Sequence, residues 1–208
     1  MVRMTWTFTT ISTLATMLAA SAVLADQGLT LPEEAAASAT KTIKKSRLRE
    51  IPLMSIEELA ADADVIVEGT MTPTRTYLAE SQRAIYTDYV VMPFQVHAQR
   101  STPTRSTPGP TRPLTVTMYG GHMVINGANV TLRDGSLSEW ASGARLLLFL
   151  KRSADGTYRV CYDVAGVFKV DGDKVTSMVR EPRAYRKLDG LALHKVKEEI
   201  KLGFKEKG

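Results

Sequence analysis

The stretch that decides the fold reads Ile85-Tyr86-Thr87-Asp88-Tyr89-Val90-Val91-Met92-Pro93-Phe94-Gln95-Val96. It is rich in β-branched and aromatic residues, which predicts a long strand from about Ala84 to Ala98. Alternate positions of a strand face opposite ways, so one face is expected to carry Tyr86, Asp88, Val90, Met92, Phe94 and Val96. Pro93 cannot donate a hydrogen bond to a neighbouring strand, which predicts a bend or a sheet edge there. Long, bent strands are what a small β-barrel needs.

Similar β-prone runs lie on both sides of this strand. Before it, the run Ala63 to Met71 is interrupted at Gly69, which indicates a bulge. After it, Asn126-Gly127 between two β-prone runs predicts a tight hairpin. The run Ala144 to Lys151 is apolar on both faces, as in a central strand. We therefore expect a mainly β fold, a small closed or partly open antiparallel barrel over residues 55–180.

Helices are expected at both ends of this barrel. Ser55 and Glu58 have the spacing of a capping box, so a short helix should start at Ile56. Near the carboxyl end, an apolar stripe recurs at helical spacing through Leu193, Val196, Ile200 and Phe204. This amphipathic helix is expected to cover an open end of the barrel; the alternatives are contact with a membrane surface or with a partner.

The first 25 residues have the pattern of a signal peptide. Arg3 precedes an apolar run from Ile11 to Leu24, and Val23 and Ala25 supply the small-residue pattern of a cleavage site. We expect an exported bacterial protein, periplasmic or extracellular, in which residues 26–54 form a flexible leader and residues 181–208 a basic tail. The chain has one cysteine, Cys161, so neither an internal disulfide nor a lipid anchor at the cleavage site is expected. In its strand, Cys161 is expected to be a small buried apolar side chain.

The charge of the chain is unevenly distributed. The sequence pI is ≈ 9.3, yet basic and acidic residues nearly balance between Ile51 and Pro182, and the basic excess lies in the two flanks. A nucleic-acid-binding barrel would gather basic residues and stacking aromatics on its folded body. We therefore expect no nucleic-acid partner. The basic ends favour solubility or a weak contact with an anionic membrane surface.

Few residues have the spacing of a chemical site. The turn Tyr119-Gly120-Gly121-His122 is the best local candidate, because two glycines let backbone N–H groups approach a ligand beside a titratable imidazole. Arg105 lies in a proline-rich loop, from Arg100 to Pro113, that is expected to be exposed. These five residues are the binding candidates. No catalytic residue, metal site or cofactor is predicted, since no motif for one is present.

Three strands and their order carry a resemblance to known proteins. The Ala63-Asp64-Val65 start of the first strand, the long strand at Tyr86 to Val91 and the late Gly143 to Leu150 strand resemble a group of uncharacterised exported bacterial proteins. More remotely, they resemble the OB-like barrel of netrin and metalloproteinase-inhibitor modules, over about Ser55 to Val175. The resemblance implies an OB-like fold. It does not carry over the inhibitors' mechanism, which needs an amino-terminal cysteine and disulfides.

The sequence thus favours a non-catalytic binding or interaction module that presents loops to an unidentified envelope or extracellular protein. The alternative from another class is an envelope hydrolase with a site assembled across the barrel, around Asp88, His97 or His122. A third possibility is a peripheral membrane-surface protein held by the basic carboxyl-terminal helix. A deep pocket that gathers the titratable groups would favour the enzyme.

Overall fold

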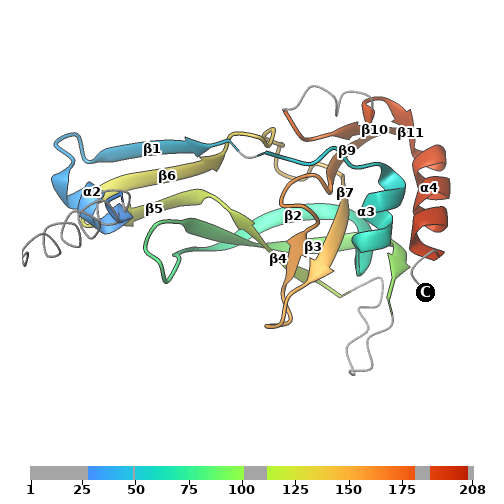
Figure 1. Ribbon diagram of the computed structural model, residues 1–208, viewed down its shortest axis with the longest axis horizontal. Helices are drawn as coiled ribbons and strands as arrows, with labels where there is room; N and C mark the ends of the chain where they lie inside the picture. Colours follow the sequence, from blue (N-terminus) through green and yellow to red (C-terminus); the bar gives the residue numbers. More distant parts are fainter. Residues whose placement is uncertain (1–27, 49, 101–111, 181–187, 206–208) are drawn as a thin grey trace, which may run out of the picture.

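The computed structural model describes residues 28–48, 50–100, 112–180 and 188–205, and they form a mainly β protein (Figure 1). The expected signal peptide and Arg105 lie outside the described residues. The helices are α2 (Leu31–Ala37), α3 (Ile56–Asp62) and α4 (Leu193–Lys205). The strands are β1 (Thr42–Arg47), β2 (Val65–Leu78), β3 (Ile85–Gln99), β4 (Leu114–Tyr119), β5 (Gly121–Ile125), β6 (Ala128–Asp134), β7 (Leu146–Arg152), β8 (Tyr158–Val160), β9 (Val167–Asp171), β10 (Lys174–Ser177) and β11 (Leu191–Ala192).

These strands form two sheets. The larger sheet has the order β11-β10-β9-β7-β2-β3-β4-β8, and an added β7–β8 pairing closes β7, β2, β3, β4 and β8 into a ring of five strands. The smaller sheet has the order β1-β6-β5 and lies at the opposite end of the molecule from α3 and α4 (Figure 1). The expectation of one antiparallel barrel needs two corrections, because β4 pairs with β8 and β1 with β6 in parallel.

The long strand and its partner bend as predicted. β3 runs antiparallel to β2, and the register shifts between Glu68 and Gly69, opposite Pro93. A side chain at Gly69 would collide with the backbone carbonyl of Met92, so the close approach of the two strands requires glycine. The bulge predicted at Gly69 is confirmed. Beyond it, the β2–β3 hairpin continues past the ring toward the smaller sheet (Figure 1).

The main core surrounds β7, which lies between β2 and β9 in the larger sheet. Its residues Leu146 to Leu150 are all fully buried, as the prediction of a central strand requires. Phe149 packs edge-on against Phe168 of β9, with ring centroids 5.6 Å apart. Cys161 is also buried in this core, where burial raises its pKa to about 12. The thiol therefore acts as a small apolar side chain.

Helices α3 and α4 pack together on the main core. The capping box is confirmed, since Ser55 Oγ accepts a 3.1 Å hydrogen bond from the N–H of Glu58, and Glu58 Oε2 accepts one of 2.7 Å from the N–H of Ser55. The apolar stripe of α4 is buried at Leu193, Val196 and Ile200. This stripe therefore contacts the protein's own core, and the described helices include none long and apolar enough to span a membrane.

The segment expected to be a flexible leader contains regular structure. Helix α2 buries Leu31 and Ala35, and strand β1 pairs with β6 from Thr42↔Asn129 to Arg47↔Asp134. Together with the tip of the β2–β3 hairpin they enclose a second core, formed by Leu31, Ala35, Ile85, Ile125, Ala128, Val130 and Leu132. Strand β1 buries few apolar side chains, so it forms mainly because its backbone pairs with the edge of β6.

Candidate functional site

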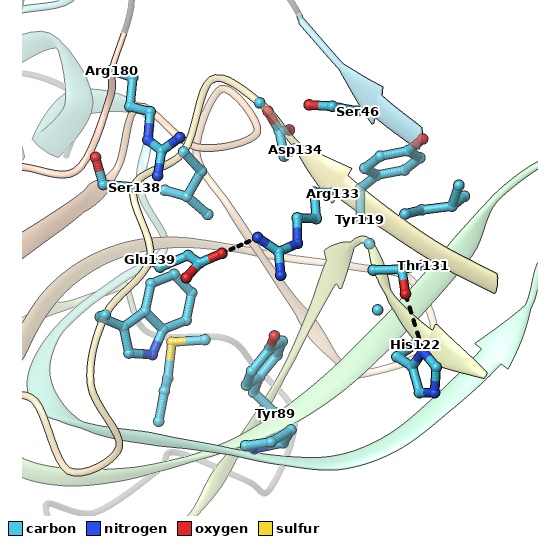
Figure 2. Close-up of a pocket in the computed structure, with 18 of the residues that line it drawn as sticks. Ser46, Tyr89, Tyr119, His122, Thr131, Arg133, Asp134, Ser138, Glu139 and Arg180 are labelled. Atoms are coloured by element: carbon cyan, nitrogen blue, oxygen red, sulfur yellow. Dashed lines mark hydrogen bonds and ion pairs between the residues drawn. The ribbon is translucent and has the colours of Figure 1, made fainter. Parts of the chain in front are cut away.

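A cavity of about 520 Å³ lies where the smaller sheet meets the ring (Figure 2). Its walls come from the ends of β1 and β6, the start of β5, the middle of β2 and β3, and the loop that follows β6. The predicted residues Tyr119, Gly120, Gly121 and His122 all line it. The structure therefore brings together four of the five binding candidates, and Arg105 lies in the part of the chain that is not described.

These four residues do not form the tight turn that is the simplest interpretation of their sequence. Instead, the chain leaves the larger sheet at Tyr119 and enters the smaller sheet at Gly121. Gly120 has φ +103° and Gly121 φ +146°, a region that side chains disfavour. A Cβ at Gly121 would also collide with Thr87 Oγ1 and Thr76 Cγ2. The glycines therefore serve the crossing between sheets, which forms one edge of the cavity.

The backbone of this crossing is tied to β3. The N–H of Gly120 donates a 2.8 Å hydrogen bond to the carbonyl oxygen of Ile85, and Thr87 Oγ1 donates one of 2.7 Å to the carbonyl oxygen of Gly120. The N–H of Gly120 is therefore used within the protein and is not a donor for a ligand. His122 lies at the rim, with its Nδ1 3.0 Å from Oγ1 of Thr131. The imidazole keeps its other nitrogen for solvent or a ligand.

One wall of the cavity is apolar and aromatic. Tyr89 and Trp140 pack with ring centroids 6.0 Å apart and an interplanar angle of 52°, and Met71, Pro73 and Leu137 extend this wall. The hydroxyl of Tyr89 points into the cavity (Figure 2) and has no hydrogen-bond partner among the residues that the structure describes. Burial raises the pKa of Tyr89 above its ordinary value, so the hydroxyl remains a proton donor at neutral pH.

The opposite wall is polar and charged. Arg133 forms an ion pair with Glu139 across the cavity, and about two thirds of each side chain is exposed, at 67% and 69% (Figure 2). Arg180 and Ser138 lie on the side opposite His122 and Thr131. Within the described ranges, the guanidinium of Arg180 has no ion pair. Arg180 and the Tyr89 hydroxyl are thus two donors at this cavity that the described protein leaves uncommitted.

Sequence reasoning missed most of this cavity. Tyr89 lies within a predicted strand, and neither Tyr89 nor Trp140 belongs to a motif that marks a site. Arg133 and Glu139 meet the Tyr119–His122 segment through the pairing of β5 with β6. Arg180 joins them through the hydrogen bond from its N–H to the carbonyl oxygen of Ser136 and the bridge between Leu137 and Val179. One signal was present: a large aromatic residue, Trp140, in a loop rich in serine and glycine, the kind of segment that often carries function.

The groups named for an envelope hydrolase are not gathered at one place. His122 lines the cavity, whereas Asp88 does not. Asp88 lies on β3, and its Oδ1 accepts a 2.7 Å hydrogen bond from Oγ1 of Thr117 on β4. His97 contacts Glu68 at 3.4 Å, and Glu68 also pairs with Arg145. Both His97 and Glu68 are almost fully buried, at 5% and 2% side-chain exposure. The described contacts therefore join none of Asp88, His97 and His122 to another.

Burial and the nearby Lys197 lower the pKa of His97, with Glu68 opposing the shift and Arg145 adding to it. None of His97, Glu68 and Arg145 lines the cavity. Within the described ranges, no group of three or more His, Cys, Asp and Glu side chains has the geometry to hold a metal ion. No family model matches the chain, and no curated protein matches it either.

Proposed function

We propose that the protein is an exported, non-catalytic binding module with an OB-like ring, whose cavity binds a small organic anion with an apolar body. The order of the five ring strands and their mostly antiparallel pairing support the OB-like description. The export signal predicted in residues 1–25 supports the location. The ligand class follows from the two walls of the cavity.

The observation that carries the ligand class is the pairing of an apolar wall with two uncommitted donors. Tyr89, Trp140, Met71 and Leu137 offer apolar surface for the body of a ligand. The Tyr89 hydroxyl and the Arg180 guanidinium donate hydrogen bonds, and no acceptor among the described residues uses them. A carboxylate at Arg180 receives two parallel hydrogen bonds from the guanidinium. A second polar group of the ligand can accept from the Tyr89 hydroxyl, which lies on the other side of the cavity (Figure 2). A cation or a neutral amide would leave the charge of Arg180 unpaired.

Trp140 makes this proposal directly testable. The chain has two tryptophans, and Trp6 lies in the expected signal peptide, so protein prepared from Asp26 onward has Trp140 as its one tryptophan. Its emission then reports the cavity wall. We expect octanoate and phenylacetate to change this emission in a saturable way, and their neutral amides, octanamide and phenylacetamide, to bind about tenfold or more weakly, since a charge-assisted hydrogen bond contributes about 1.5 to 3 kcal/mol.

Two variants locate the binding. Arg180→Gln should weaken octanoate binding to the level of octanamide, whereas Arg83→Gln, at an exposed arginine on the β2–β3 turn, should leave it unchanged. The proposal is wrong if neither acid alters the emission of Trp140, or if each acid and its amide bind equally well. Retention of octanoate affinity in Arg180→Gln would also contradict it.

A further inference from the structure

The outer face of the β2–β3–β4 sheet carries a row of three tyrosines in register. Tyr77 of β2 pairs with Tyr86 of β3, and Tyr86 pairs with Tyr119 of β4. The ring centroids are 6.2 Å apart for Tyr77 and Tyr86 and 6.1 Å apart for Tyr86 and Tyr119. Each of the three residues is partly exposed. The planes of Tyr77 and Tyr86 differ by 32°, and Tyr119 meets Tyr86 edge to face at 87°, so the three rings form a stepped aromatic surface across three strands. We call it the tyrosine row.

An arginine lies over each end of the tyrosine row. The guanidinium of Arg75 is 5.2 Å from the ring centroid of Tyr77, and that of Arg47 is 6.0 Å from the ring centroid of Tyr119. Such contacts hold the arginines over the aromatic faces while their N–H groups stay in solvent. The ends of the row therefore supply hydrogen-bond donors that are already positioned.

A second row of polar groups runs beside the first. Arg75, Asp88 and Thr117 are aligned across the same three strands. Asp88 Oδ1 accepts hydrogen bonds from Thr117 Oγ1 at 2.7 Å and from the Tyr77 hydroxyl at 3.4 Å. Among the described residues, Asp88 Oδ2 accepts no hydrogen bond and the Tyr86 hydroxyl makes none. The centre of the face thus keeps one acceptor and one donor for a ligand.

The face is hollowed beside the tyrosine row. A depression of about 70 Å³ is lined by Tyr86, Thr117 and Tyr119 on one side and by Arg159 and Asp163 on the other. It is separate from the large cavity, although Tyr119 and Asp134 line both. A ligand lying along the row can place one substituent in this depression, where a guanidinium and a carboxylate are close together.

We propose that the tyrosine row binds a neutral oligosaccharide. The apolar C–H faces of sugars pack on aromatic ring faces, and Tyr77 and Tyr86, whose planes differ by 32°, offer two such faces side by side. The hydroxyls of a sugar both donate and accept hydrogen bonds, which matches the mixture of Arg75, Asp88 and the Tyr86 hydroxyl. A row of three rings is longer than one ring, which favours a chain of sugars over a monosaccharide. Asp88, at the centre of the face, repels a phosphate backbone and so disfavours single-stranded nucleic acid.

The test uses the full chain with two soluble neutral glycans, chitohexaose and cellohexaose, in isothermal titration calorimetry. We expect at least one to bind, and Tyr86→Ala to weaken that binding about tenfold or more, the size of one lost aromatic contact. Phe94→Ala is the matched control, because Phe94 is a 60% exposed aromatic residue on the same strand outside the row. It should leave the affinity unchanged.

Far-ultraviolet circular dichroism and thermal unfolding establish that each variant is folded. If Tyr86→Ala does not fold, Tyr77→Ala, which removes the end ring of the row, gives the same test. The proposal is overturned if neither glycan binds, or if binding survives the loss of the ring. It is also overturned if oligodeoxythymidylate binds in a Tyr86-dependent way while the glycans do not, since the row then recognises bases. This proposal does not depend on the organic-anion cavity, because octanoate binding reports Trp140 and glycan binding reports the tyrosine row.

Discussion

Thr87 Oγ1 of β3 donates a 2.7 Å hydrogen bond to the buried carbonyl oxygen of Gly120, the residue at which the chain passes from the larger sheet to the smaller one. This bond joins the two sheets at the edge of the cavity. Thr76 Oγ1 lies 3.2 Å from Thr87 Oγ1 and extends the contact to β2. The position of the cavity rim therefore depends on a threonine that itself does not line the cavity.

Replacing this threonine tests the connection. Thr87→Val keeps the shape of the side chain and removes the donor, so the buried carbonyl of Gly120 loses a partner. We expect the free energy of unfolding to fall by about 1 to 3 kcal/mol, measured by urea denaturation. Thr72→Val is the matched control at an exposed threonine of β2, and should change stability by less than about 0.5 kcal/mol. Equal effects of the two substitutions would contradict the role of the Thr87–Gly120 bond.

Cys161 should be unreactive in the folded protein. Its pKa is raised to about 12, chiefly because burial disfavours the thiolate, with Asp62 adding to the effect. Since the thiolate is the reactive species, we expect native protein at pH 8 to react with 5,5′-dithiobis(2-nitrobenzoate) orders of magnitude more slowly than protein unfolded in guanidinium chloride. Rapid reaction of the native protein would show that the thiol is accessible or ionised.

His97 should make the protein less stable as the pH falls. Its folded-state pKa lies below the ordinary value of 6.5, so below pH 6.5 the unfolded chain binds a proton more readily than the folded chain. The stability contributed by neutral His97 is therefore fully present above about pH 6.5. It is lost as the pH falls through that value toward the lower folded-state pKa.

The measurement for His97 is the free energy of unfolding between pH 7.5 and pH 5, obtained in urea. The charged groups that act on His97, namely Glu68, Arg145 and Lys197, are present in both the wild type and the variant, so the quantity compared is the slope of stability against pH. His97→Gln should flatten the decline, because glutamine does not titrate. Identical slopes for the wild type and His97→Gln would show that another group causes the acid sensitivity.

The fold was predictable where a local pattern determines the structure. The capping box at Ser55, the bulge at Gly69, the hairpin at Asn126-Gly127 and the buried strand β7 follow from short stretches of sequence, and each is confirmed. In contrast, β1 reads Thr-Ile-Lys-Lys-Ser-Arg, and only Ile43 packs against a core. Its strand structure comes from the parallel hydrogen bonds to β6, which no pattern within its own residues can indicate.

The candidate site was predictable to a similar extent. Gly120, Gly121 and the titratable His122 marked this segment as a candidate, although the sequence predicted a turn there rather than a crossing between two sheets. The charged and aromatic walls of the cavity were not predicted from the sequence, because Tyr89, Arg133 and Trp140 come together only after the sheets have formed. The tyrosine row was hidden for the same reason: Tyr77, Tyr86 and Tyr119 are aligned by strand register, which the sequence does not specify across the β3–β4 connection.

The contact between α3 and α4 gives a last prediction, at Gly203. A Cβ at this position would collide with the backbone carbonyl of Glu57, so the two helices approach as closely as they do only because residue 203 is glycine. In an isolated helix, Gly→Ala stabilises by about 1 kcal/mol. Here we expect Gly203→Ala to destabilise the protein by about 1 to 3 kcal/mol, because the backbone of α3 must shift and the packing of Val196 and Ile200 is disturbed.

Urea denaturation of Gly203→Ala measures the sum of the gain in helix propensity and the cost of the collision with Glu57. Amide hydrogen exchange in α4 shows whether the loss of stability occurs in that helix. Leu202→Ala, at the neighbouring 58% exposed residue, is the control and should change stability by less than about 0.5 kcal/mol. A Gly203→Ala protein that is more stable than the wild type would mean that helix propensity outweighs the collision and that α4 does not lie this close to α3. Faster exchange confined to α4 would instead show that this close contact holds the carboxyl-terminal helix on the core, and that its apolar stripe becomes exposed only when the contact is broken.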